Sequence, residues 1–138
     1  MSYLLDTNVL SEIRRKAPHP GVEAWVADRK PESLYLSTLT LGEIRRGIEG
    51  LPASTRRLGL SDWLENDLTR FFAGRLLAID AAVADRWGRL LADAGRPMPV
   101  IDSLLAATAL QHDLVLVTRN LRDFGFAGLR TFDPWAAA

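Results

Sequence analysis

Short apolar segments alternate along this chain with segments whose apolar residues recur at helical spacing, and this alternation constrains the fold more than any other feature. The strand-like segments are residues 3–5, 34–37, 75–80 and 114–118, with a weaker one at 129–132. Between them, apolar residues at intervals of three and four predict helices. Strands that alternate with helices predict a parallel sheet covered on both faces, a three-layer α/β/α fold.

Prolines and glycines divide the helical segments from one another. The expected helices cover residues 7–15, a segment that follows Pro20, a segment that opens at 40–43, and residues 53–72, 81–94 and 101–112. We expect Thr7 or Asn8 to cap the first of them and the tail at Pro134 and Trp135 to pack on the body. No repeat or long linker divides the chain, so we expect a single domain over residues 1–138.

Composition excludes several classes of protein. The chain has no cysteine, which rules out disulfides, thiolate zinc sites and cysteine nucleophiles. It has no apolar run of ~18 residues and no secretion signal, so we expect a cytoplasmic protein without a membrane segment. Its 17 basic residues balance 17 acidic ones, which argues against tight non-specific DNA binding but allows a local basic rim. Three arginine clusters, at 14–16, 45–46 and 56–57, could form such a rim or lie on solvated helix faces.

Four acids stand where a parallel sheet could bring them together. Asp6 ends the first strand, Glu43 lies one turn into the helix after the second, and Asp123 follows the fourth. The carboxyl ends of parallel strands share one edge of the sheet, where open α/β folds bind ligands. Asp102, near the start of a helix, reaches that edge only if its helix belongs to an inserted pair rather than a simple crossover.

Each acid also has a purely structural interpretation. Asp6 could only cap the first helix, Thr40 and Glu43 match a capping box, and the helix dipole favours Asp102 without any chemistry. Asp123 could cap a turn, and Asp80 is better explained as a cap than as a catalytic group.

Four motifs together resemble the PIN-domain ribonucleases, and more narrowly the VapC-type toxins of bacterial toxin–antitoxin pairs, including FitAB-like pairs. The motifs are Leu4-Leu5-Asp6-Thr7-Asn8, Ser37-x-x-Thr40-x-x-Glu43-Ile44-x-x-Gly47, Asp102-x-x-Leu105-Ala106-Ala107-x-Ala109 and Val117-Thr118-Arg119-Asn120-x-x-Asp123-Phe124. They fall in order along essentially the whole chain. The resemblance implies a sheet of about five strands, in which Asp6, Glu43, Asp102 and Asp123 meet in one pocket.

The same resemblance implies RNA hydrolysis with Mg²⁺ or Mn²⁺. Carboxylate oxygens are the preferred protein ligands of these ions, which keep several waters, one of them a possible nucleophile. In our assignment Asp6 and Asp102 bind metal directly, while Glu43 and Asp123 bind it directly or through water. The supporting residues are Thr7, Asn8, Thr118 and Asn120. Whether one metal or two bind is left open, as is whether Asn120 or Asp123 lies closer.

The resemblance further implies a homodimer, inhibition by a cognate antitoxin, and a larger toxin–antitoxin assembly. The apolar residues of the 53–72 helix, together with Val22, Trp25 and Val26, could form a dimer or antitoxin surface, or could be ordinary core.

Two other functions are compatible with these residues. A non-catalytic α/β binding module would use the acids only as caps, and a phosphoryl-transfer receiver or phosphatase would need a lysine near the last strand, whereas the only lysines are Lys16 and Lys30.

Overall fold

Five parallel strands form the centre of the molecule in a computed structural model that describes residues 1–136. The predicted domain over residues 1–138 therefore extends two residues beyond the described part. The strand order is β3-β2-β1-β4-β5. The strands are β1 Tyr3–Leu5, β2 Leu34–Ser37, β3 Leu76–Leu77, β4 Val115–Val117 and β5 Thr131–Phe132. All five predicted strands exist, and those predicted at 75–80, 114–118 and 129–132 are shorter than expected.

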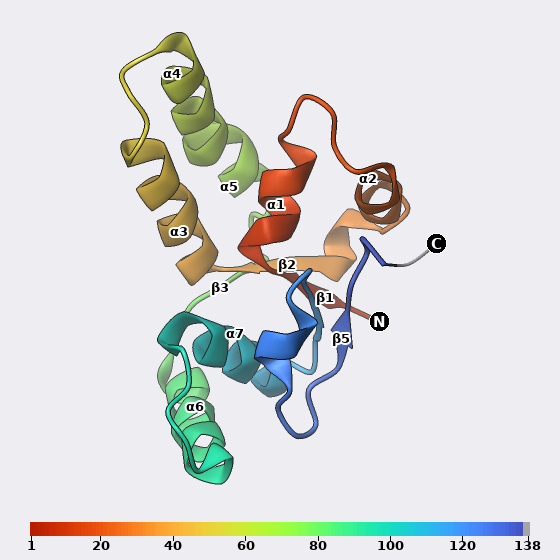
Figure 1. The fold of residues 1–138 in the computed structure, drawn as a ribbon, viewed down its shortest axis with the longest axis vertical. Coiled ribbons are helices and arrows are strands. Elements are labelled where there is room, and N and C mark those ends of the chain that lie inside the picture. Colours follow the sequence, from red (N-terminus) through yellow and green to blue (C-terminus); the bar gives the residue numbers. More distant parts are fainter. Residues whose placement is uncertain (137–138) are drawn as a thin grey trace.

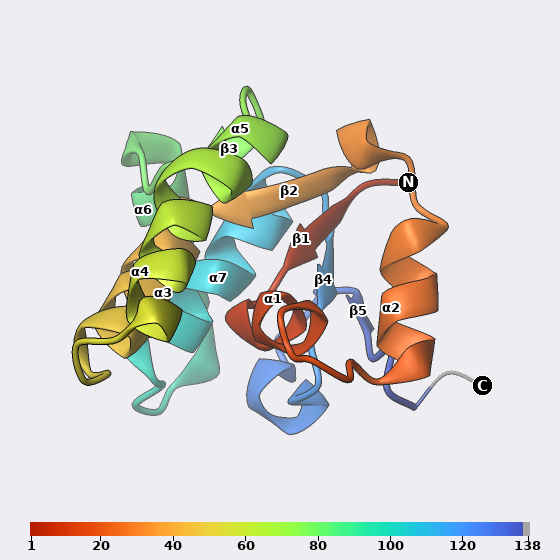
Figure 2. The ribbon, with the colours of Figure 1, turned by 90° about the horizontal axis from the view of Figure 1, so that it is seen from above.

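Helices cover both faces of this sheet, as the alternating pattern predicts (Figures 1 and 2). Alternate residues of each strand point to opposite faces, and the core is divided accordingly. Leu5 and Val117 lie in one apolar cluster, and Leu4 and Leu116 lie in the other. The first cluster packs against the helices that come before β3, and the second packs against the two that follow it. The helices are α1 Thr7–Ile13, α2 Pro20–Ala27, α3 Thr38–Glu49, α4 Thr55–Asp62, α5 Thr69–Phe71, α6 Ala81–Ala94 and α7 Val100–Gln111.

The helix predicted over residues 53–72 is interrupted. A π-helical segment, η2 (Trp63–Leu68), separates α4 from α5. The extra residue in a π turn shifts the helix face, which keeps Leu64, Leu68 and Phe72 buried in the core. Apolar periodicity alone predicts the segment as helical but does not reveal this change of winding.

The caps of the helices differ in part from expectation. Asp6, not Thr7 or Asn8, is the N-cap of α1, because its side chain accepts a hydrogen bond from the backbone N–H of Thr7. Asp80 caps α6 through the N–H of Val83, as expected. Two short 3-10 helices, η1 (Pro31–Ser33) and η3 (Leu121–Phe124), complete the fold.

Of the two apolar segments considered for a partner surface, the one with Val22 and Trp25 belongs to the core, whereas residues 53–72 bury Leu64, Leu68 and Phe72 and expose Leu58 and Phe71. Val22 is fully buried, and Trp25 packs edge-on against Tyr3 and stacks on Phe132. Trp135 and the buried Pro134 pack on the same side of the sheet, so the expected packing of the tail is confirmed. Among the helices of residues 1–136, none combines the length and the apolar character needed to cross a membrane.

Candidate active site

Asp6 occupies the end of the central strand, where the order of the sheet reverses between β2 and β4. Its carboxylate is 7% exposed and accepts three hydrogen bonds. The donors are the Thr7 backbone N–H at 2.7 Å, the Thr118 hydroxyl at 2.8 Å and the Asn8 amide at 3.3 Å. Asp6 is therefore both a helix cap and a member of the site, and the two interpretations offered by the sequence do not exclude each other.

Thr118 ties the ends of β1 and β4 together. Its fully buried hydroxyl donates to Asp6 and accepts hydrogen bonds from the Asn8 side chain at 3.3 Å and the Asn120 backbone N–H at 3.1 Å. One hydroxyl thus fixes the orientation of the central carboxylate relative to both flanking loops.

Glu43 reaches the same edge from α3, and the capping-box interpretation of this residue is wrong. The cap of α3 is Ser37, whose hydroxyl accepts from the Leu39 N–H at 3.1 Å. Glu43 instead accepts a hydrogen bond of 2.6 Å from the Thr7 hydroxyl, which joins α3 to α1. Thr40 lies inside the helix, and within residues 1–136 its buried hydroxyl has no hydrogen-bond partner.

Asp102 lies in the first turn of α7. Two helices, α6 and α7, connect β3 to β4 on the face opposite α1, so the condition for Asp102 to reach the carboxyl edge is met. The start of α7 is held by Ser103, whose buried hydroxyl accepts from the Trp87 indole of α6 at 2.9 Å and donates to the Val100 carbonyl.

The cleft over this edge has a volume of ≈ 500 Å³ and is lined by three of the four predicted acids, Asp6, Glu43 and Asp102. Asp123, exposed on η3, does not line it. Charges at this edge nevertheless act on Asp6 and Asp102. Burial raises the pKa of Asp6, helped by the charges of Glu43 and Asp123 and opposed by the Thr118 and Thr7 hydrogen bonds. Burial raises the pKa of Asp102 too, and the charges of Asp6, Asp123 and Glu43 raise it further.

These oxygen ligands fit Mg²⁺ or Mn²⁺ better than softer metals. Within residues 1–136, no three histidine, aspartate or glutamate side chains are close enough together to hold an ion as they stand. Mg²⁺ usually keeps several of its waters, so carboxylates that gather around one cleft can bind it partly through water. The carboxylate chemistry and the mutual repulsion of these acids therefore suit a hydrated hard cation.

Sequence reasoning missed Ser11, Glu12, Arg119 and Trp135, which also line this cleft. Glu12 is only 6% exposed and accepts hydrogen bonds from the Arg15 side chain, the His19 backbone N–H and the Trp135 indole. Glu12 lies among polar neighbours in a segment predicted to be helical, so the sequence does not indicate that its side chain is buried. Only the return of the C-terminal tail to α1 brings Trp135 within reach.

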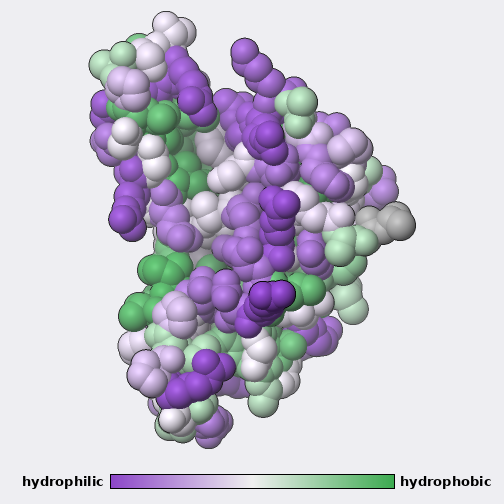
Figure 3. Space-filling view, in the orientation of Figure 1, coloured by the Kyte–Doolittle hydropathy of each residue, from purple (hydrophilic) through white to green (hydrophobic). Residues whose placement is uncertain are grey.

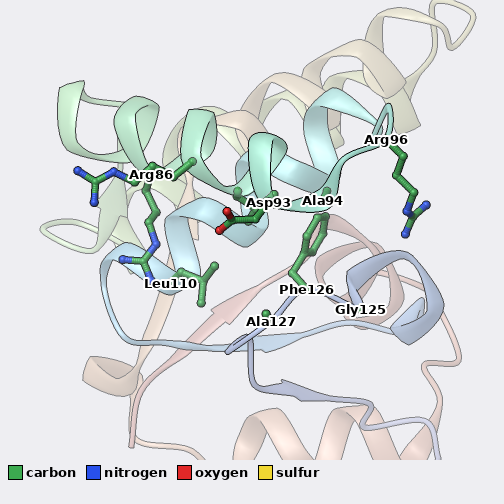
Figure 4. A pocket seen from close by; sticks show the side chains of 10 residues that line it. Arg86, Asp93, Ala94, Arg96, Leu110, Gly125, Phe126 and Ala127 are labelled. Atoms are coloured by element: carbon green, nitrogen blue, oxygen red, sulfur yellow. The ribbon is translucent and has the colours of Figure 1, made fainter.

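A separate cleft of ≈ 530 Å³ lies between α6 and the loop after η3 (Figure 4). Arg86 and Arg96 lie toward its two ends, and Phe126 faces Ala94 across it. None of the predicted acids lines this cleft.

Comparison with known proteins identifies the fold. A family model described as the PIN domain matches residues 3–127. The VapC ribonuclease Y4jK of Sinorhizobium fredii is 36% identical, over 98% of this chain and 99% of its own length. Toxin FitB of Neisseria gonorrhoeae is 37% identical, over 96% and 97%. The crystal structure of FitAcB from the same organism superposes with a TM-score of 0.91 at 36% identity, covering 98% of this chain and 99% of that one. The chain therefore belongs to the PIN-domain family.

Proposed function

We propose that the chain is a Mg²⁺- or Mn²⁺-dependent ribonuclease that acts as the toxin of a toxin–antitoxin pair. The observation that carries the proposal is the gathering of Asp6, Glu43 and Asp102, from three distant parts of the sequence, in one cleft. Kinship with a VapC ribonuclease and with toxin FitB supports both the reaction and the biological role.

Each carboxylate has a role that fits its position. Asp6 and Asp102, the two whose pKa burial raises, would bind the metal directly, and Glu43 and Asp123 would bind it directly or through its waters. When bound, the ion neutralises charge that develops on the phosphate and lowers the pKa of a bound water. Thr7 holds Glu43, and Thr118 holds Asp6, while Asn8 and Asn120 support the shell around them.

Cleavage of single-stranded RNA by the full chain tests this proposal. We expect cleavage with Mg²⁺ or Mn²⁺, none in EDTA, and a loss of at least a hundredfold in Asp6→Asn and Asp102→Asn, since single transition-state contacts to developing charge contribute about that much. Thr108→Val, a change in a buried residue of α7 remote from the cleft lining, is the folding control. If the Asp variants cut RNA as well as wild type, the acids are only caps and the protein is a binding module.

An apolar groove supports the proposed antitoxin partner. Ile44, Ile48, Leu60 and Trp63 line it between α3, α4 and η2, and its lining extends to Thr7 and Glu43 beside the acids. Hydrophobic residues are visible between α4 and the middle of the molecule in Figure 3. A partner helix seated there would lie next to the active site. We expect Trp63→Ala to weaken binding of the cognate antitoxin without changing RNA cleavage.

We also propose a homodimer in the cytoplasm. Val100, Ile101 and Leu121 are exposed apolar residues at the start of α7 and on η3, and these two elements lie in contact. Exposed apolar side chains on two neighbouring elements support a protein contact. Sedimentation of the purified chain as a strict monomer at micromolar concentration would remove this part of the proposal.

A further inference from the structure

The acid cleft is lined by basic as well as acidic side chains. Asp6, Glu12, Glu43 and Asp102 line it together with Arg15, Arg119 and Trp135. Carboxylates suffice to bind a hard cation, whereas a polyanion bound beside such a cation would also use a guanidinium group.

Arg15 and Arg119 differ in what they contact. The Arg15 guanidinium donates to Glu12 at 3.2 Å, so its charge is matched within the protein. The Arg119 side chain is exposed, and among residues 1–136 it forms no ion pair and no side-chain hydrogen bond. Its backbone N–H lies 3.5 Å from the Asn8 side chain, which ties it to the loop beside Asp6.

The ring of Trp135 holds this free guanidinium in place. The Cζ atom of Arg119 lies 5.4 Å from the centre of the ring. A guanidinium over an aromatic ring keeps the N–H groups at its edge free for an oxyanion. Carboxylate and phosphate can both be bound by this fork in a bidentate manner, and phosphate is the one that an RNA strand offers.

Trp135 is itself anchored at two points. Its indole N–H donates to the buried Glu12 at 3.3 Å, and its backbone N–H donates to the Asp133 carboxylate at 2.8 Å. Glu12 is also bound by the His19 N–H at 3.1 Å, so α1, the loop after it and the tail meet at one carboxylate. This arrangement immobilises a ring that would otherwise lie on a loose tail.

We propose that Arg119, which lies over the ring of Trp135, binds a phosphate of the RNA strand next to the one that lies at the carboxylates, and that Glu12 positions Trp135 for this contact. The inference rests on the proposed ribonuclease function for the identity of the polyanion. It adds to that function a residue that binds the strand and a reason for the C-terminal tail to return to the active site.

RNA binding, measured without cleavage, tests the inference. The parent protein is the full-length Asp6→Asn variant in EDTA, and the probe is a fluorescently labelled single-stranded RNA followed by anisotropy between 20 and 200 mM KCl (~ a tenfold range that resolves the salt slope). We expect Arg119→Gln to weaken binding about tenfold, as the loss of a hydrogen bond to a charged group would. It should also reduce the slope of log K against log salt by about 0.7, the value for one phosphate contact on a single strand.

Matched variants separate positioning from general charge. Arg119→Lys should keep the salt slope but lose part of the affinity, because lysine lacks the fork. Trp135→Phe, which retains a ring, should bind RNA better than Trp135→Ala, and Glu12→Gln should fall between the parent and Arg119→Gln. Arg96→Gln removes an exposed arginine that lines the other cleft and should leave the slope unchanged.

Three outcomes overturn the inference: no RNA binding by the parent at low salt, an unchanged slope in Arg119→Gln, or an equal loss in Arg96→Gln. Because Arg119 is exposed, its variants should fold, and equal melting temperatures check this. Binding is measured with cleavage disabled and without metal. A chain that binds RNA as expected but never cuts it would therefore refute the proposed function and leave this inference standing.

Discussion

The two oxygens of the Asp6 carboxylate have different hydrogen-bond partners. One oxygen caps α1 through the Thr7 N–H, and the other receives the Thr118 hydroxyl and the Asn8 amide. Hydrogen bonds to the charged form offset part of the desolvation that raises its pKa.

Removal of the Thr118 hydroxyl should reduce catalysis more than stability. Thr118→Val keeps the shape of the side chain but leaves one Asp6 oxygen without its shortest side-chain donor. Partners that orient a metal ligand typically contribute about 10–100-fold to activity or metal affinity, so we expect a loss in that range in an RNA cleavage assay. The matched control is Thr108→Val, which changes a buried threonine whose hydroxyl donates to the Leu104 carbonyl of its own helix. Equal losses in the two variants would contradict the role of Thr118.

Asp102 should destabilise the metal-free protein at neutral pH. Burial and three neighbouring negative charges raise its pKa above the unfolded value of ~3.9. A carboxyl group whose pKa is higher in the folded protein than in the unfolded chain stabilises the fold at pH values below its pKa in the unfolded chain. This stabilisation is lost as the pH rises through the pKa of the folded state. We expect Asp102→Asn to raise the melting temperature in EDTA at pH 7, with a gain that shrinks as pH falls toward 4.

Thermal melts of wild type and Asp102→Asn across that pH range measure the effect. Asp93→Asn, which removes an exposed carboxylate of α6 outside the acid cleft, controls for a general change in charge. If the gain in melting temperature of Asp102→Asn instead grew toward low pH, the raised pKa of Asp102 would not be its cause.

The sequence predicts which acids lie at the site, but not the contacts that depend on how helices and the C-terminal segment pack. Asp6 and Glu43 could be predicted because parallel strands bring the residues after their carboxyl ends to one edge of the sheet. The bond from Thr7 to Glu43 could not, since it depends on the angle between α1 and α3. The hydrogen bond between Glu12 and Trp135 could not be predicted either, because nothing in the sequence links two residues 123 positions apart.

At the scale of elements, the pair α6 and α7 decides whether Asp102 reaches the site. These two helices make the most extensive contact of any two elements, and the Trp87–Ser103 hydrogen bond joins them one residue from Asp102. A single crossover helix from β3 to β4 would begin at the carboxyl edge and end at the opposite one. The connection here holds two helices, and Asp102 in the first turn of the second one, α7, lines the same cleft as Asp6.

The cap of α6 should contribute to stability without affecting the chemistry. Asp80 ends the β3 region, as Asp6 ends β1, but its side chain accepts from the Val83 N–H at 2.9 Å and does not line the acid cleft. Loss of an N-cap typically costs about 1 kcal/mol. We therefore expect Asp80→Ala to lower the free energy of unfolding by that amount in urea titration and to cleave RNA at the wild-type rate. Loss of cleavage in a folded Asp80→Ala protein would mean that the set of site acids is wrong.

At the scale of the whole molecule, the order of the strands explains why the site lies where it does. Successive strands add outward from β1 to β2 and β3, and the chain then crosses to β4 on the other side. The loops after β1 and β4 diverge at this switch point and leave a crevice. The alternation of apolar segments predicts the parallel sheet, but it does not give the strand order, because helical crossovers of similar length can lead to either neighbour.

Divalent metal should stabilise the whole fold, because the carboxylates converge only in the native state. A ligand that binds the folded chain alone adds about 2.7 kcal/mol at 100 times its Kd, which corresponds to a rise in melting temperature on the order of 10 °C for a domain of this size. We expect Mg²⁺ or Mn²⁺ to produce such a rise in wild type, a smaller one in Glu43→Gln, and none in Asp6→Asn with Asp102→Asn. Ca²⁺ and added KCl at equal ionic strength separate specific binding from screening, since screening acts alike on every exposed charge. A shift that is the same in the double variant would place the ion elsewhere, and no shift at millimolar metal would leave the cleft without the cation that its four acids are proposed to hold.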